Sequence, residues 1–297
     1  MKIQIKRPGG SFLQLDGGNL VWTEKEWEAE LRSMKKLGMD TVIIGTVENN
    51  NYSFYRSEKR PLFEKTGTDD PLATLLSLAQ KLDMKVFVGL CAWDWKRMNE
   101  GDFEEFARRC LTVADELWGR YGTSRAFAGW YALSWEMGNA PAEQDAGVQM
   151  YLKAISHLRK LSPGLPIMTA PYFTLDVTPQ VFEDSWRKLL PVLKVDIVAL
   201  QDGVGCGRNL TPKNIGPYFE GMQRACHSAG VHLWADVEVF DIPSGWKPAP
   251  TERIVQQMEA VSPHVERIVF FEYNHYLSPV KGFKDGEELT ETLARLP

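Results

Sequence analysis

Short apolar runs alternate with longer segments of mixed polarity along the whole of this chain. Apolar runs bounded by glycine, proline or polar residues are typical of buried strands, and the longer mixed segments are typical of helices. The predicted strands cover residues 10–15, 41–46, 85–90, 127–135, 166–170, 195–200, 231–237 and 267–271. The predicted helices cover about residues 23–37, 71–82, 102–121, 142–161, 178–190, 211–230, 250–262 and 286–295.

Several helix boundaries carry local signals. Thr23 is followed three residues later by Glu26, which is the spacing of a capping box. Gly38 suits a helix end, and Pro71 suits a first helical turn. A long polar loop follows the second strand as far as about residue 70, and loops of this length inside a compact domain are usually functional or mobile.

Strands that alternate with helices predict a parallel sheet, and eight units in 297 residues predict a closed (β/α)₈ TIM barrel of the α/β class. We expect one domain spanning residues 1–297. The alternative is a doubly wound open sheet, which usually has a glycine-rich phosphate-binding turn after an early strand. The segment Asp16-Gly-Gly-Asn19 lacks that spacing. The barrel is favoured, and its active site is expected at the carboxyl ends of the strands.

Composition and charge narrow the class of protein. Hydrophobic residues make up 44% and charged residues 25% of the chain, as in ordinary globular domains. The net charge is −5 and no basic block is present, so neither nucleic acid nor an anionic membrane surface is an expected partner. The amino-terminal segment Met1-Lys-Ile-Gln-Ile-Lys-Arg7 has no apolar stretch of signal-peptide length, and no run in the chain reaches the length of a membrane span. We expect a cytoplasmic protein, or a secreted one if a leader precedes this sequence in nature.

The four cysteines lack the spacing of metal ligands. Free thiols fit a reducing compartment. Cys206 lies in Gly203-Val-Gly-Cys-Gly207, and this glycine-rich segment predicts a thiol on a loop.

Acids and other polar residues gather where the predicted strands end. They are Gln14, Asp16, Glu48, Asp94, Glu136, Tyr172, Asp202, Asp236, Glu238, Glu272 and His275. Glycoside hydrolysis needs one carboxyl group to donate a proton and a second to attack the sugar or activate water. Glu136 follows the fourth strand and Glu238 the seventh, on opposite sides of the predicted ring. We predict Glu136 as general acid/base and Glu238 as nucleophile or base. The alternative for either is a structural ion pair.

Further residues at the strand ends are predicted to bind sugar. Asp202 is a third catalytic candidate, as a modulator of a neighbouring pKa, a hydroxyl acceptor or the base itself; the alternative is a turn residue. For Glu48 a solvated turn is the favoured interpretation, and a metal beside His275 is a disfavoured one. The predicted substrate-binding residues are Gln14, Glu48, Trp93, Asp94, Trp135, Tyr172, Trp234, Asp236, Glu272, Asn274, His275 and Tyr276.

The alternation of side chains along a strand sorts these residues by face, since residues two apart share a face. If Glu238 points into the barrel, Asp236 and Trp234 do so too. The same argument groups Glu272 with Phe270.

The placement of Glu136 and Glu238 resembles that of the acid/base and nucleophile in the large clan of retaining barrel glycosidases, which use the same two strands. That clan has asparagine directly before the glutamate of the fourth strand. This chain has Trp135 there. Retention and inversion of configuration therefore both stay open.

Five segments together resemble the family named domain of unknown function 4434, over essentially the whole chain. The segments are Gly10-Ser-Phe-Leu-Gln14, Trp27 through Gly38 leading into Asp40-Thr-Val-Ile43, Gln201-Asp-Gly-Val-Gly205, Trp234-Ala-Asp-Val-Glu238 and Phe271-Glu-Tyr-Asn-His-Tyr-Leu-Ser-Pro279. The resemblance implies a TIM barrel with a carbohydrate-related activity, in a family provisionally classed as glycoside hydrolases. It carries over Gln14, Asp202, Glu238 and Glu272 as pocket positions.

The sequence thus predicts a barrel that hydrolyses glycosidic bonds in an oligo- or polysaccharide, with no cofactor. A metal-dependent sugar isomerase or epimerase is the alternative enzyme class, because such barrels also gather acids and histidine at strand ends. A carbohydrate-binding barrel without catalysis is the alternative outside the enzymes.

Overall fold

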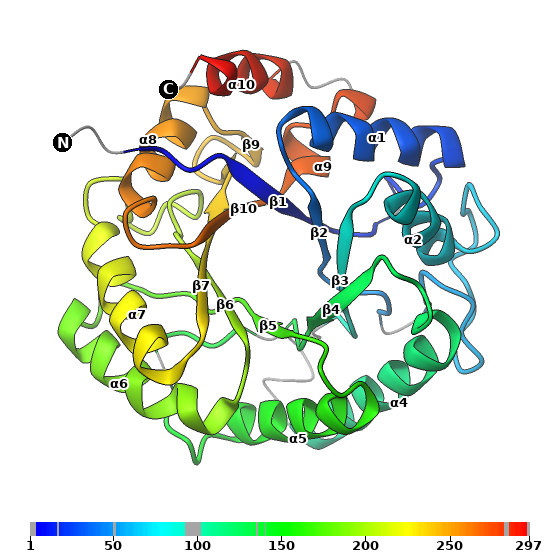
Figure 1. Ribbon diagram of the computed structural model, residues 1–297, viewed down its shortest axis with the longest axis horizontal. Coiled ribbons are helices and arrows are strands. Elements are labelled where there is room, and N and C mark those ends of the chain that lie inside the picture. The colour runs from blue at the N-terminus through cyan, green and yellow to red at the C-terminus, as the bar shows by residue number, and fades with distance from the viewer. Residues whose placement is uncertain are drawn as a thin grey trace.

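The computed structural model describes residues 4–16, 18–49, 52–92, 102–134, 136–139, 141–281 and 285–295. Parallel strands close into a barrel in the order β1-β10-β7-β6-β5-β4-β3-β2, and helices surround this ring (Figure 1). The barrel strands are β1 (Pro8–Leu13), β2 (Thr41–Ile44), β3 (Lys85–Gly89), β4 (Phe127–Tyr131), β5 (Ile167–Thr169), β6 (Ile197–Gln201), β7 (His232–Glu238) and β10 (Arg267–Phe271). The predicted (β/α)₈ barrel is confirmed, and the open sheet is excluded.

The helices pack around the outside of the ring (Figure 1). They are α1 (Glu24–Lys36), α2 (Pro71–Lys81), α4 (Phe103–Tyr121), α5 (Ala146–Leu161), α6 (Pro179–Leu193), α7 (Gly216–Ala229), α8 (Thr251–Val261), α9 (Tyr273–Tyr276) and α10 (Asp285–Ala294), with a short 3₁₀ helix at Pro279–Lys281. Within the described residues, none of these helices has the length and apolar character that crossing a membrane requires.

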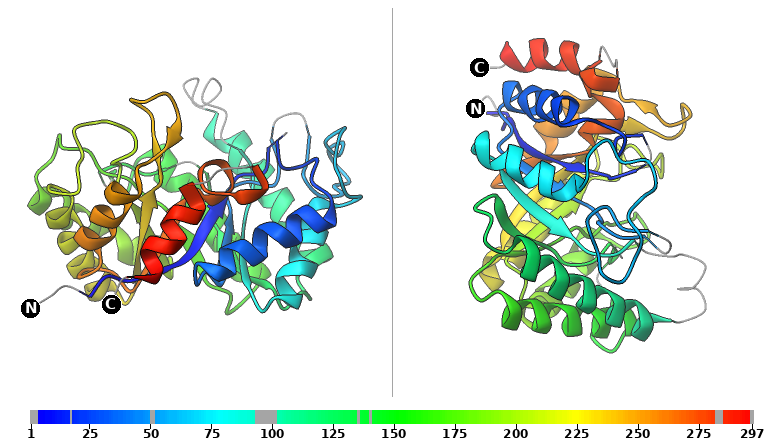
Figure 2. Two further views of the ribbon diagram at one scale, coloured as in Figure 1. Left: turned by 90° about the horizontal axis from the view of Figure 1, so that it is seen from above. Right: turned by 90° about the vertical axis from the view of Figure 1, so that its right-hand side faces the viewer.

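An antiparallel hairpin extends the seventh unit. Its strands are β8 (Phe240–Asp241) and β9 (Lys247–Pro248), and it follows β7 almost directly. The hairpin projects beyond the carboxyl ends of the barrel strands (Figure 2).

The helix signals in the sequence act as expected. The Thr23 side chain accepts a hydrogen bond from the Glu26 backbone, and the Glu26 carboxylate accepts one from the Thr23 backbone, so the capping box of α1 is present. Pro71 lies in the first turn of α2, where Asp70 caps the helix.

Several predicted boundaries differ from the structure: helix α5 begins at Ala146 rather than at residue 142, and helix α7 begins at Gly216 rather than at residue 211. For two further differences tertiary packing gives the reason. Strand β4 ends at Tyr131 rather than at residue 135, because its neighbour β5 has only three residues and pairs with β4 no further than Tyr131. Helix α6 continues through Pro191 to Leu193 rather than stopping before the proline. Proline removes one backbone hydrogen bond there, but Leu193 is fully buried in the core, and its packing favours continuing the last turn.

Apolar side chains fill two layers, one inside the barrel and one between the barrel and the helices. Inside, Phe12 packs edge-on against Tyr131 with ring centroids 5.3 Å apart, and Phe87 packs similarly against Trp234 at 5.9 Å. Because these side chains fill the barrel, they form a floor beneath its mouth.

The prediction of which side chains point into the barrel is confirmed for β7 and wrong for β10. Trp234 packs within the inner layer, and Asp236 and Glu238 face the barrel mouth, as predicted. On β10 it is Phe271 that faces inward, whereas Phe270 lies in the outer layer. Residue 272 lies beyond the end of β10, so strand alternation does not extend to it.

The close approach of β3 to the end of β2 gives a test of barrel packing. A Cβ atom at Gly89 would lie 2.0 Å from the carbonyl oxygen of Gly45, whereas one at Gly119 on α4 would meet nothing within 4 Å. Gly89→Ala should lower the free energy of unfolding by about 1–3 kcal/mol. Gly119→Ala, the matched control, should raise it by up to about 1 kcal/mol because alanine favours helix. Urea unfolding followed by tryptophan fluorescence tests both; equal stability of Gly89→Ala and wild type would contradict the packing.

Candidate active site

A cavity of about 450 Å³ opens at the carboxyl ends of the strands. Its described lining comes from segments at the ends of most of the barrel strands and from the β8–β9 hairpin. The lining residues are Phe12, Gln14, Gly45, Thr46, Ala92, Tyr131, Ser134, Glu136, Gln201, Cys206, Asp236, Glu238, Phe240, Ile242, Trp246 and Phe271. Three of them are acids and none is lysine, arginine or histidine, so the described lining favours positive over negative charge.

Glu238, the last residue of β7, is held at both carboxyl oxygens by one residue of the β6–α7 loop. The Cys206 backbone N–H lies 3.0 Å from Oε2, and the Cys206 Sγ lies 3.3 Å from Oε1. Only 3% of Glu238 is exposed. Burial and the nearby charge of Asp202 raise the pKa of Glu238, while the donors from Cys206 and Gly205 favour its ionised form.

Glu136 lies five residues beyond the end of β4 and is partly exposed to the cavity. Burial raises its pKa to about 7, against the opposing effects of a hydrogen bond from the Gln201 side chain and the charge of Arg208. Glu136 and Glu238 therefore line the same cavity, although their strands are not diametrically opposite, since only β5 and β6 separate β4 from β7. A carboxyl group with such a pKa can donate a proton near neutral pH.

Asp236 lies in the cavity wall and is 1% exposed. Neither of its carboxyl oxygens has a hydrogen-bond partner among the described residues. Burial raises its pKa well above the ordinary value, and the nearby carboxyl groups of Glu238, Asp202 and Glu136, with Glu272, add to the effect. Asp236 is thus the one carboxyl group among the described residues with both oxygens buried and without a partner.

Asp202, the third catalytic candidate, does not line the cavity. Its carboxylate accepts hydrogen bonds from the Val204 backbone at 3.1 Å, the Glu238 backbone at 3.3 Å and the Gln257 side chain at 2.6 Å. The bond to Val204 is the Asx turn that formed the alternative interpretation. Asp202 thus supports the end of β7 from behind, and its charge raises the pKa of Glu238.

The segment after β10 forms a charged chain at the rim. His275 Nδ1 lies 2.5 Å from Glu272 Oε1, and His275 Nε2 pairs with Asp16. Burial alone lowers the pKa of His275, but the hydrogen bonds to Asp16 and Glu272 outweigh it and raise the pKa to about 9. Glu272 also accepts a hydrogen bond from the Gln14 backbone at 2.9 Å, and Asn274 donates to the Gln14 carbonyl at 3.0 Å. These residues brace the rim, and of this group only Gln14 lines the cavity.

Aromatic side chains border the cavity on the side of the hairpin. Trp246 is 61% exposed and stacks on Phe240 with ring centroids 5.6 Å apart and planes at 22°. Phe271 lies edge-on to Phe240 at 6.1 Å, and Tyr276 packs against Phe240 at 5.6 Å. An exposed indole beside buried carboxyl groups is a surface on which an apolar sugar face can stack.

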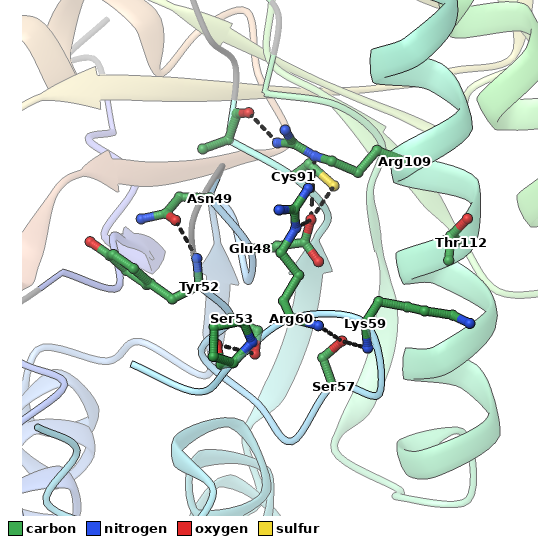
Figure 3. A network of polar contacts seen from close by, with 12 residues as sticks. Glu48, Asn49, Tyr52, Ser53, Ser57, Lys59, Arg60, Cys91, Arg109 and Thr112 are labelled. Carbon is green, nitrogen blue, oxygen red and sulfur yellow. Dashed lines mark hydrogen bonds and ion pairs between the residues drawn. The ribbon is translucent and has the colours of Figure 1, made fainter. Parts of the chain in front are cut away.

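Glu48 faces a different cleft, of about 570 Å³, between the β2–α2 loop and α4 (Figure 3). It is 1% exposed and pairs with Arg60 Nε at 3.1 Å and Arg109 Nε at 3.3 Å, with Cys91 beside it. The solvated turn favoured for Glu48 is therefore wrong, and the structure does not bring Glu48 to the cavity at the barrel mouth.

The remaining candidates are placed as follows. Trp234 lies toward the amino end of β7, between Phe87 and the Arg267 guanidinium, so it fills the barrel rather than lining the cavity. Tyr172 pairs with the segment around Gly138 and is absent from the described lining. Trp93, Asp94 and Trp135 lie outside the described residues.

Several lining residues were not named as site residues from the sequence. Cys206 was expected only to be a loop thiol, and its two contacts with Glu238 depend on how that loop folds back over β7. Gln201 carried a weak signal, since it directly follows the predicted sixth strand, whereas Tyr131 was expected inside the fourth strand and not at its end. Among the described residues, no three or more histidine, cysteine or acidic side chains are grouped so as to hold a metal ion.

Comparison with known proteins supports the same kind of barrel. The sequence profile of the family described as "Domain of unknown function (DUF4434)" matches residues 9–282. No curated protein matches the sequence.

Among solved structures, a Bacteroides thetaiotaomicron VPI-5482 protein provisionally described as an alpha-L-fucosidase is similar, with a TM-score of 0.85 at 23% identity over 99% of this chain and 96% of that one. An endo-1,4-beta-D-mannanase from Thermotoga petrophila RKU-1, solved with maltose and glycerol, has a TM-score of 0.64 at 13% identity over 97% and 99% of the two chains. A family 1 beta-glucosidase from Thermotoga maritima has a TM-score of 0.61 at 10% identity over 98% and 99%. At these identities the similarity shows the fold, which this chain shares with glycosidases.

The charged chain at the rim predicts a pH-dependent contribution to stability. The pKa of His275 is raised from 6.5 to about 9 by folding, so its stabilising effect is complete below about pH 6.5 and is lost as the pH rises through about 9. His275→Gln should therefore lower the urea midpoint most at about pH 6, and the difference from wild type should shrink by about pH 9.5.

The matched control is His232→Gln, since His232 forms an exposed pair with Glu266. It should change the midpoint little at any pH. A His275→Gln difference that stays constant or grows with pH would contradict the assignment of charge to His275.

Proposed function

This chain belongs to the DUF4434 family, and we propose that it is a glycoside hydrolase in which Glu136 is the general acid/base and Glu238 the nucleophile or base. The observation that carries the proposal is that these two carboxyl groups, from the ends of β4 and β7, line one cavity. Most glycosidases cleave the glycosidic bond with two carboxyl groups that flank it.

The surroundings of the two acids support different roles for them. Glu238 receives N–H and S–H donors at both oxygens, which favour its carboxylate against the burial and the Asp202 charge that raise its pKa to about 8. The carboxylate is the form that must attack the anomeric carbon or deprotonate water. Glu136 has a pKa raised to about 7, which suits the proton donor to the leaving oxygen.

In a retaining reaction Glu238 forms a bond to the anomeric carbon while Glu136 protonates the departing oxygen, and Glu136 then removes a proton from the water that releases the sugar. In an inverting reaction Glu238 removes the proton from the attacking water instead. The separation of the two carboxyl groups when substrate is bound decides between these two courses.

The aromatic border of the cavity supports a carbohydrate as the substrate. Trp246 and Phe240 offer stacked rings beside the acids, and Gln14 adds an amide for sugar hydroxyl groups. The glycosidase barrels among the solved structures similar to this chain support the same class of reaction. Oligo- or polysaccharide is therefore the proposed substrate class.

Replacement of the two acids tests the proposed roles. Glu136→Gln and Glu238→Gln should each lower kcat/KM by at least about 10³-fold on an aryl glycoside selected from a panel of sugars, since each removes a group that acts in the transition state. Glu28→Gln, at an exposed pair with Arg32 on α1, is the matched control and should keep full activity. Wild-type rates in either active-site variant, with folding confirmed by circular dichroism, would remove that residue from the mechanism.

The pH dependence of kcat/KM gives a second test. The reaction needs Glu136 protonated and Glu238 ionised, and their pKa values are raised to about 7 and about 8. Activity should therefore pass through a maximum between these values and fall on the alkaline side, where Glu136 has lost its proton. This limb should disappear in Glu136→Gln when the leaving group is 2,4-dinitrophenolate, which departs without protonation. Wild-type activity that stays level between about pH 6 and 9 on an alkyl glycoside would exclude Glu136 as the acid.

A further inference from the structure

Asp236 is a buried carboxyl group that the proposed chemistry does not use. It lies in the cavity wall beside the catalytic pair, is 1% exposed, and neither oxygen has a hydrogen-bond partner among the described residues. A buried polar group without a partner is destabilising, and a buried carboxylate more so. A ligand that donates hydrogen bonds to Asp236 would therefore supply the donors that the described residues lack, and this would favour its binding.

The residues beside Asp236 either hydrogen bond to other groups or are apolar. Its neighbours across the sheet are Gln201 on β6 and Val269 on β10. The Gln201 amide donates to the Ala170 carbonyl at 2.9 Å and bonds to Glu136, so it is directed away from Asp236. Val269 has no polar atom in its side chain.

No positively charged side chain is among the described lining residues. The charge of Arg208 acts on Glu136, whereas the charges that act on Asp236 are those of other acids. The Arg253 guanidinium hydrogen bonds to backbone carbonyl groups of Val204, Glu238 and Phe240 in the shell behind β7. His275 pairs with Asp16 and Glu272 at the rim. Among the described lining residues, therefore, the three carboxyl groups of Glu136, Asp236 and Glu238 face one another without a cation.

We propose that the sugar unit bound over Asp236 carries a protonated amine, so that the substrate is an amino sugar with its nitrogen unacetylated. This inference rests on the proposed function for the presence of a sugar. An ammonium group brings three donors and a positive charge to a site that has unpaired acceptors, and its charge favours the ionised form of the crowded carboxyl groups. A hydroxyl group would donate one hydrogen bond and bring no charge.

An N-acetyl group is the contrasting case. Its carbonyl oxygen is an acceptor, so it would bind well only if Asp236 kept its own proton and donated it. Sugars that differ only in bearing an amine, a hydroxyl or an N-acetyl group therefore show whether the site prefers an ammonium group, a neutral donor or an acceptor.

The test measures equilibrium binding of nine monosaccharides to the full chain by calorimetry at pH 7. The probes are glucosamine, galactosamine and mannosamine, each with its hydroxyl parent and its N-acetyl derivative. In at least one of the three sets, the amine should bind at least tenfold more tightly than both relatives, a difference of about 1.4 kcal/mol. The inference is overturned if no amine shows this preference, including the case in which no amine binds at tens of millimolar.

Variants connect the preference to Asp236. Asp236→Asn should reduce the amine preference to within about twofold of unity. The matched control Asp184→Asn, on the exposed face of α6, should keep the preference, which shows that loss of one negative charge elsewhere is not enough. A full amine preference in Asp236→Asn would overturn the assignment.

The outcome is separable from that of the proposed function, because binding is measured without turnover. If neutral glycosides bind best and are hydrolysed, the amine preference is contradicted and the hydrolase function is supported. If the amine binds best but no glycoside is cleaved, the hydrolase function is contradicted and the amine site is supported.

Discussion

Closure of the parallel sheet brings the carboxyl ends of all its strands to one mouth, so acids from distant parts of the chain must share one small, partly dry cavity. Burial disfavours the charge of each acid, and the neighbouring acids disfavour it further. Glu136, Asp236 and Glu238 consequently have raised pKa values. Such a cavity favours any positive charge that enters or develops in it, and the transition state of glycosidic cleavage resembles an oxocarbenium ion.

The residues behind the end of β7 hold Glu238 in position without bonding to its carboxyl group. Asp202 and Gln257 hold the backbone at the end of β7, and Arg253 bonds to carbonyl groups of the same segment. These contacts position Glu238 while leaving its carboxyl group in the cavity. At the rim, His275 pairs with acids that lie outside the described lining, so its charge is not directed at the three acids of the cavity.

The barrel was predictable because apolar runs and helix signals repeat along the chain, and position relative to a strand end placed Glu136, Asp236 and Glu238 at one mouth. The directions of other side chains were not predictable, because they depend on partners far away in the sequence. Glu48 turns outward to Arg109, 61 residues away, and Gln257 reaches Asp202 across 55 residues. The end of β4 likewise depends on the shortness of β5.

The most direct test of the account is a crystal structure of the Glu136→Gln variant soaked with an oligosaccharide. We expect the glycosidic oxygen to lie about 3 Å from the side chain of residue 136. The anomeric carbon should face Glu238 at about 3–3.5 Å, or through one water molecule. An oligosaccharide bound instead in the outer cleft beside Glu48, or one whose glycosidic oxygen contacts neither Glu238 nor residue 136, would contradict the account.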